Sequence, residues 1–157
     1  MKNALRSKKG WRKKQSLTGK VKTMRFLDTN ILLRYFTGDN LEMAESARRL
    51  LAIIQRGEEK VVTSPLVVFE TVFTLQRTYG VSRERIGSMV GAIISLPGIR
   101  FAEKRLCLEA LDVFVQHRIS FADAYTVVHM KARGITEIYS WESDFDKIED
   151  VRRVVPT

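Results

Sequence analysis

From Met24 onward, short apolar runs alternate with longer stretches of helical periodicity. The runs predict five β-strands, at residues 24–27, 60–63, 99–101, 137–139 and 152–154. Each run is short and mostly apolar, as buried parallel strands are. This alternation is typical of βαβ units. We therefore predict an α/β fold whose central sheet is five-stranded, mostly parallel and covered by helices on both faces.

Capping signals set the boundaries of several predicted helices. Ser64 and Pro65 form an N-cap and a first helical residue, and the helix that they begin should run to about Tyr79. Ser82 can cap the next helix, which should extend through Ser95. The remaining helices are predicted at residues 29–36, 41–55, 103–117 and 121–132.

Length and charge divide the chain into a basic tail and one domain. The 157 residues suffice for a single core, and the net charge is +9. Residues 1–23 hold nine of the 27 basic residues and none of the 18 acids, so residues 24–157 hold 18 of each. We expect the tail to be disordered or loosely docked and the domain to span residues 24–157. The tail could be an arm for nucleic acid, a non-native extension or a solvated segment.

Composition also limits the compartment and the metal chemistry. No run approaches the length of a membrane span, and no apolar stretch follows the basic N-terminus as in a secretory signal. We expect a cytoplasmic protein without membrane association. Cys107 is the single cysteine, which excludes an internal disulfide and a thiolate metal cage.

Acidic residues follow two predicted strands and lie in two predicted helices. Asp28 follows the first strand, where it can serve as a metal ligand or as a helix N-cap. Glu70 lies in an apolar helix, where it can be a metal ligand, lie on a partly solvated strip of the helix, or pair with Arg77. Asp123 lies three residues after Ser120 and can be a ligand, part of a capping box, or both.

The fourth acidic segment, residues 140–146, follows the strand at 137–139 and includes Glu142 and Asp144. Each of these acids could belong to an ordinary solvated loop. Taken together, however, the four segments lie in an order that a parallel sheet could bring to one cleft. Two carboxylates about 4 Å apart repel by ~4 kcal/mol at an effective dielectric near 20, so such a cluster needs a cation. Oxygen ligands without Cys or clustered His indicate Mg²⁺ or Mn²⁺.

These segments resemble the four acidic motifs of PIN domains, in the order found in VapC-type toxins. The resemblance spans residues 24–156 and rests on Phe-Leu-Asp28-Thr-Asn30, Val-Phe-Glu70-Thr, Phe-Ala-Asp123-Ala and Ser140-Trp-Glu142-Ser-Asp144-Phe. It implies a PIN-like α/β/α sandwich and a metal-dependent endoribonuclease. It also implies RNA as substrate, a VapB-like antitoxin as partner and a homodimer formed through a helical face.

The resemblance further implies roles for individual residues. Asp28, Glu70 and Asp123 would be the central metal ligands, and Asp144 and Glu142 would support them or hold a second metal. In the last motif, Ser140 and Glu142 stand where the family usually has Thr and Asp, so Glu142 would reach a metal with its longer side chain either directly or through water.

Four neighbouring residues complete the expected site. Asn30 and Ser140 are expected to orient the acids. We expect Arg34 and Arg118 to contact RNA.

The sequence is compatible with two other functions. A PIN nuclease could process RNA without being a toxin, and a catalytically silent PIN-like module could bind RNA or a protein. Metal-dependent cleavage would distinguish enzyme from binding module, and a neighbouring antitoxin gene would distinguish toxin from processing nuclease. A response-regulator receiver is disfavoured because no suitably placed phosphoacceptor and lysine pair is present.

Overall fold

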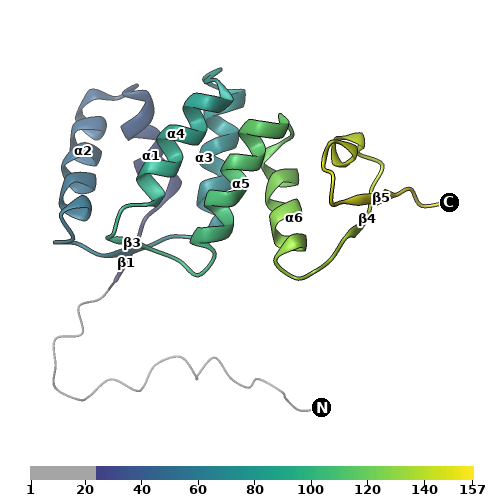
Figure 1. The fold of residues 1–157 in the computed structure, drawn as a ribbon. Helices are drawn as coiled ribbons and strands as arrows, with labels where there is room; N and C mark the ends of the chain where they lie inside the picture. Colours follow the sequence, from purple (N-terminus) through teal and green to yellow (C-terminus); the bar gives the residue numbers. More distant parts are fainter. Residues whose placement is uncertain (1–23) are drawn as a thin grey trace, which may run out of the picture.

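The computed structural model describes residues 24–157, in which helices predominate and short parallel strands connect them (Figure 1). The basic tail at residues 1–23, which the sequence predicts to be disordered or loosely docked, lies outside the described residues. In chain order the elements are β1 (Arg25–Phe26), α1 (Thr29–Thr37), α2 (Leu41–Gln55), β2 (Val61–Val62), α3 (Pro65–Arg77), α4 (Arg83–Ile94), β3 (Ile99–Arg100), α5 (Lys104–His117), α6 (Phe121–Lys131), β4 (Glu137–Tyr139), the 3-10 helix η1 (Ser143–Lys147) and β5 (Arg152–Val154). The predicted α/β class is confirmed.

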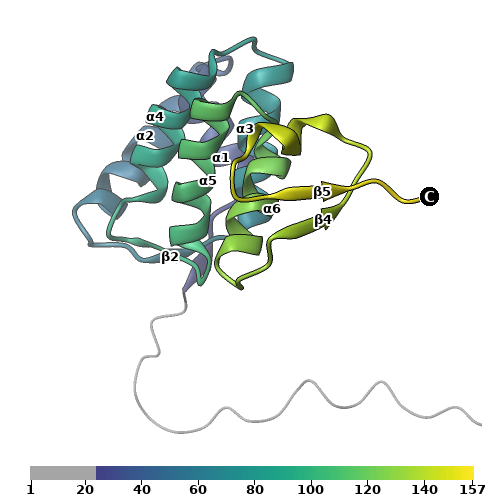
Figure 2. The same ribbon diagram turned by 45° about the vertical axis from the view of Figure 1, so that its right-hand side comes forward.

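The five strands lie where the sequence predicts them and form two parallel sheets. The first sheet has the order β1-β2-β3, and β4 pairs with β5 in the second. Within residues 24–157 no backbone ladder joins the two sheets, so the continuous sheet suggested by the sequence is divided into three strands and two. Figure 2 shows the β4–β5 pair beside α6, on the side away from α2.

Polar side chains begin most of the helices. Asp28, Asn40, Ser64, Ser82 and Ser120 each accept a hydrogen bond from a backbone N–H in the first turn of the helix that follows. Such caps satisfy backbone donors that would otherwise have no partner. The short polar residues between the apolar stretches therefore set where five of the helices start.

Apolar faces of the helices meet in two buried clusters. One joins α3, α4, α5 and α6 and includes Phe114, which is fully buried and packs edge-on against Phe121 at a centroid distance of 6.2 Å. The other joins α1 and α2 to the first sheet and includes Leu32 and Ile54. Cys107 is buried in the first cluster, and burial raises the pKa of its thiol to about 12. This thiol is therefore a side chain of the core.

Arg118, between α5 and α6, has a left-handed backbone conformation with φ 55° and ψ 31°. It is the one non-glycine residue with positive φ among those that the structure describes. For a residue with a Cβ atom this conformation costs about 1–2 kcal/mol, because Cβ crowds the following carbonyl oxygen. The turn between α5 and α6 is therefore strained.

Replacing Arg118 with glycine is expected to raise the free energy of unfolding by about 0.5–1 kcal/mol, because glycine adopts positive φ without this crowding. Urea denaturation of wild type and variant measures the change. Glu109→Gly, within α5, is the matched control and should lower stability by a similar amount. Equal destabilisation by both substitutions would contradict the interpretation of strain at Arg118.

Candidate active site

The β1–α1 junction presents the first predicted acid. Asp28 is the N-cap of α1, and its Oδ2 accepts hydrogen bonds from the backbone N–H of Asn30 at 3.4 Å and from Asn30 Nδ2 at 3.2 Å. Asp28 therefore caps α1, as one of the two alternatives from the sequence predicts. Its carboxylate remains solvent-exposed, so capping leaves it accessible to a ligand. The amide of Asn30 orients this carboxylate, as expected for a residue next to the site.

One hydrogen bond links this junction to Glu70 on α3. Thr29 is buried, and its Oγ1 donates to Glu70 Oε2 at 2.7 Å. Because Thr29 directly follows Asp28, the bond brings two of the four acidic segments together across 41 positions of sequence. Glu70 is exposed, in agreement with a partly solvated strip of the helix, and among the described residues it makes no ion pair with Arg77.

Asp123 is held at the beginning of α6 by Ser120. The hydroxyl of Ser120 accepts from the backbone N–H of Asp123 at 3.0 Å and donates to Asp123 Oδ2 at 2.6 Å. The carboxylate is partly exposed. Ser120 thus fixes both the first turn of the helix and the orientation of the acid.

The fourth acidic segment follows β4. Ser140 Oγ accepts from the backbone N–H of Glu142 at 2.9 Å and so fixes the turn that presents this exposed acid. Asp144, in η1, pairs with Lys147 at 2.5 Å. A cation that binds Asp144 would therefore have to compete with the Lys147 ammonium.

The four segments do not meet in one group in this structure. Among residues 24–157, no three His, Cys, Asp or Glu side chains lie close enough to hold a metal ion together. The hard oxygen donors suit Mg²⁺ or Mn²⁺, and Asp28 and Glu70 are linked through Thr29. The donor chemistry fits such a cation, whereas the full ligand set is not gathered.

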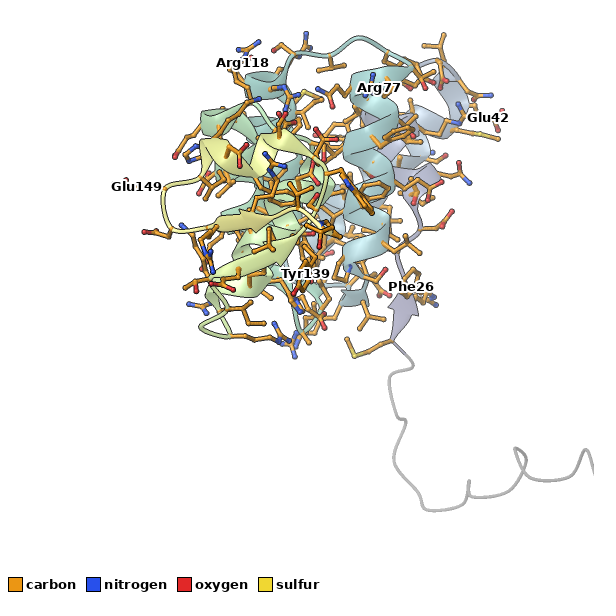
Figure 3. All side chains as sticks on the ribbon, turned by 90° about the vertical axis from the view of Figure 1, so that its right-hand side faces the viewer. Phe26, Glu42, Arg77, Arg118, Tyr139 and Glu149 are labelled. Atoms are coloured by element: carbon orange, nitrogen blue, oxygen red, sulfur yellow. The ribbon has the colours of Figure 1, made fainter. Side chains whose placement is uncertain are left out.

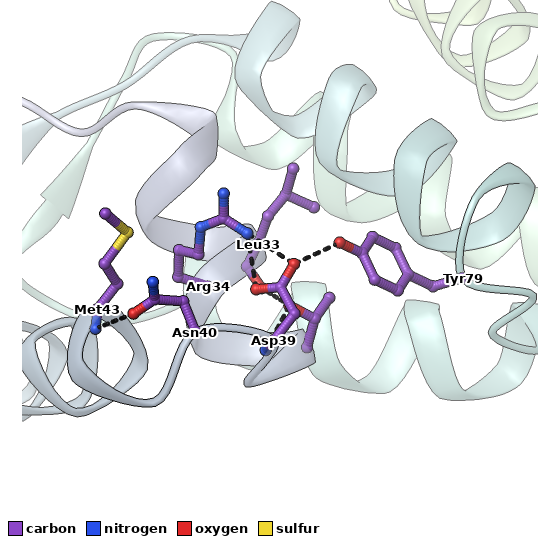
Figure 4. A network of polar contacts seen from close by, with 7 residues as sticks. Leu33, Arg34, Asp39, Asn40, Met43 and Tyr79 are labelled. Atoms are coloured by element: carbon purple, nitrogen blue, oxygen red, sulfur yellow. Dashed lines mark hydrogen bonds and ion pairs between the residues drawn. The ribbon is translucent and has the colours of Figure 1, made fainter.

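The two predicted RNA-binding arginines differ in their surroundings. Arg34 Nη1 donates to both carboxylate oxygens of Asp39, at 2.7 and 2.6 Å, and this interaction raises the pKa of the guanidinium (Figure 4). Arg118 is exposed (Figure 3) and lies 3.8 Å from Glu84, at a distance where a surface pair is weak. Arg118 is thus the more available of the two for a phosphate group.

Asp39 also accepts a hydrogen bond from Tyr79 Oη at 2.8 Å, which joins the α1–α2 turn to the segment after α3 (Figure 4). The hydrogen bonds from Arg34 and Tyr79 lower the pKa of Asp39 from 3.8 to about 2. A carboxyl group whose pKa is lowered on folding stabilises the fold above its unfolded pKa, and this contribution disappears as pH falls through the folded value.

Replacing Asp39 with asparagine is therefore expected to lower the melting temperature at pH 7, because the variant lacks the charged partner of Arg34 and Tyr79. The difference from wild type should shrink as pH falls from about 4 to about 2. Thermal denaturation followed by circular dichroism across this range measures it. The exposed Asp112→Asn serves as the control, and a difference that is independent of pH would contradict the assignment.

Comparison with known proteins identifies the family. The family model described as the PIN domain matches residues 25–151, and the chain belongs to this family. The chain is similar to the VapC ribonuclease of Aquifex aeolicus (strain VF5), with 27% identity over 125 residues that cover 80% of this chain and 92% of the relative.

Two residues of the site could not be assigned roles from the sequence. Thr29 stands inside the first acidic motif, but its bond to Glu70 joins elements far apart in the chain. Arg83, at the start of α4, contacts the turn before Asp123, and nothing in its sequence neighbourhood signals this contact.

Among the helices of residues 24–157, none combines the length and the apolar composition that a membrane span requires.

Proposed function

We propose that this protein is a metal-dependent endoribonuclease of the VapC toxin type. Its membership of the PIN family and its similarity to a protein named VapC ribonuclease support the proposal. The structural observation that supports it best is the Thr29–Glu70 hydrogen bond, which connects the exposed Asp28 segment to a second acid. Such an arrangement is suited to binding a hard cation beside an RNA phosphate.

In this proposal Asp28, Glu70 and Asp123 hold Mg²⁺ or Mn²⁺, while Asp144 and Glu142 support them. The bound ion would supply an activated water and stabilise negative charge on the phosphate. Asn30 and Ser120 keep the carboxylates of Asp28 and Asp123 oriented through the hydrogen bonds described above. These residues reduce the reorganisation that metal binding requires.

Phosphate recognition is assigned to Arg118 and, in a rearranged state, to Arg34. Arg118 is available because its contact with Glu84 is long and exposed. Arg34 would first have to leave Asp39, which it contacts with both carboxylate oxygens. Arg118 is therefore expected to contribute more to RNA affinity than Arg34.

We also infer a VapB-like antitoxin and a homodimer as partners. Exposed apolar side chains recur along α3, at Leu66, Phe69 and Phe73, and provide a surface suited to burial against another helix. Phe69 and Phe73 stack with centroids 6.0 Å apart, so their rings form one continuous apolar surface. Sedimentation of the purified protein tests the dimer, and a monomer at all concentrations would exclude it.

The deciding experiment incubates the purified protein with a labelled, mixed RNA pool in the presence of Mg²⁺, Mn²⁺ or EDTA. Cleavage that requires metal supports the proposed nuclease. Calorimetry with Mn²⁺ measures binding separately from chemistry. Absence of both cleavage and metal binding would reject the proposal.

A catalytically silent PIN-like module is the second candidate. It is favoured by the observation that, within the described chain, no three potential ligands form a metal-binding group. RNA binding without cleavage would identify it. Metal-dependent cleavage without a neighbouring antitoxin gene would instead indicate an RNA-processing nuclease.

A further inference from the structure

Arg83, the first residue of α4, reaches the turn between α5 and α6. Its Nη1 donates to the carbonyl oxygen of Phe114 at 3.3 Å and also to that of Ile119. Its Cζ atom lies 4.6 Å from the centroid of the Phe114 ring. One guanidinium thus contacts the last turn of α5, the residue just before the N-cap of α6, and an aromatic ring of the core.

The segment that Arg83 contacts is the strained one. Arg118 is left-handed, and Ile119, which follows it, is fully buried. A residue in an unfavourable backbone conformation persists where its surroundings fix it from several sides. Here the guanidinium of Arg83 fixes the carbonyl of Ile119, and the buried side chain of Ile119 fixes the same residue from within the core.

This fixed turn leads directly to Asp123. Ser120 is the next residue after Ile119, and its hydroxyl both accepts from the Asp123 backbone N–H and donates to the Asp123 carboxylate. A displacement of the Ile119 carbonyl would move Ser120 and, through it, the carboxylate. Arg83 therefore has a continuous connection to Asp123 without touching it.

The charges around Arg83 agree with a fixed position. Burial is the main cause that lowers its pKa, followed by the positive charge of Arg118, whereas Asp144 and Glu84 act in the opposite direction. The cation also lies at the C-terminal end of α5, where the helix dipole favours positive charge.

We propose that Arg83 is a positioning residue: it holds residues 118–120 so that Asp123 is oriented for the divalent cation. The inference rests on the proposed function, because it assumes that Asp123 is a metal ligand. A purely structural Arg83 would stabilise the core without affecting metal affinity. The positioning role and the purely structural role therefore predict different Mn²⁺ affinities for Arg83 variants.

The test compares Arg83→Met and Arg83→Lys with wild type, and uses Arg85→Met as the matched control. Arg85 lies on the same turn of α4, is exposed and has no side-chain polar contact with another described residue. Calorimetry with Mn²⁺ is the main readout, and thermal denaturation reports folding. For Arg83→Met we expect about a tenfold weaker Mn²⁺ affinity, as for loss of other groups that orient ligands.

Arg83→Lys should recover part of this affinity, because an ammonium group can still donate to the Ile119 carbonyl. Arg85→Met should bind Mn²⁺ as wild type does. In Arg83→Met, the metal concentration needed for the half-maximal rate should rise, whereas the cleavage rate at saturating metal should change by a smaller factor. A folded Arg83→Met variant with wild-type Mn²⁺ affinity would overturn the inference.

If Arg83→Met does not melt cooperatively, a double-mutant cycle with Arg83→Lys and Ser120→Ala provides the test. Residues that act through one connection have non-additive effects. Non-additive changes in Mn²⁺ affinity would support the inference, and additive changes would overturn it. A wild-type protein that binds no Mn²⁺ would instead reject the proposed function, so the two failures are distinguishable.

Discussion

Asp28→Asn is expected to lower metal-dependent RNA cleavage on the order of a hundredfold or more, because it removes one charged ligand of the proposed cation. Asparagine is as good an N-cap as aspartate, so α1 should keep its start. Its side-chain oxygen can still accept from the backbone N–H of Asn30, which lies 3.4 Å from the Asp28 carboxylate. Initial rates of cleavage over a range of Mn²⁺ concentrations measure the effect.

The matched control for this experiment is Asp112→Asn. Asp112 is an exposed acid on α5, outside the predicted motifs. The Asp112→Asn variant loses the same charge as Asp28→Asn but keeps the proposed ligands. Its rate of RNA cleavage should therefore stay near that of wild type. If both variants cleave at the wild-type rate, Asp28 is no ligand; if both lose activity, net charge rather than the site is responsible.

Phe114→Ala should cause the largest loss of stability among the substitutions discussed. Phe114 is fully buried, packs against Phe121 and lies beneath the guanidinium of Arg83. Removing a buried phenylalanine ring costs about 3–5 kcal/mol, since it forfeits burial and leaves a cavity. Because whole domains are stable by about 5–15 kcal/mol, urea denaturation should reveal a large fall in the transition midpoint.

Phe26→Ala is the control for this prediction. The side chain of Phe26 is 58% exposed on β1, so its removal leaves little cavity and should change stability by about 0.5 kcal/mol. Equal losses of stability from both substitutions would show that the packing around Phe114 stabilises the fold no more than an exposed ring does.

Local patterns predict the elements well because their causes are local. The strand at Glu137–Tyr139 has the predicted bounds, and Ser64 with Pro65 begins α3 as expected. Apolar periodicity and capping act within a few residues, so both can be recognised in the sequence. The PIN family was likewise recognisable, since four short motifs in order specify it.

Contacts between distant segments could not be predicted in the same way. The sequence suggested Arg77 as a partner for Glu70, whereas Thr29 donates the hydrogen bond. The division of five strands into two sheets also depends on tertiary packing, since strands of two or three residues specify no pairing partner. The hydrogen bonds of Arg83 to Ile119 and of Tyr79 to Asp39 are long-range contacts of the same kind.

Because Cys107 is buried, its reactivity reports the opening of the helical core. The chain has a single cysteine, and its thiol lies in the core between the helices α3 to α6. A thiol reagent can react with it only when this core separates, because the folded state excludes both the reagent and the thiolate form. The rate of labelling under native conditions therefore measures how often these helices part, without any introduced probe.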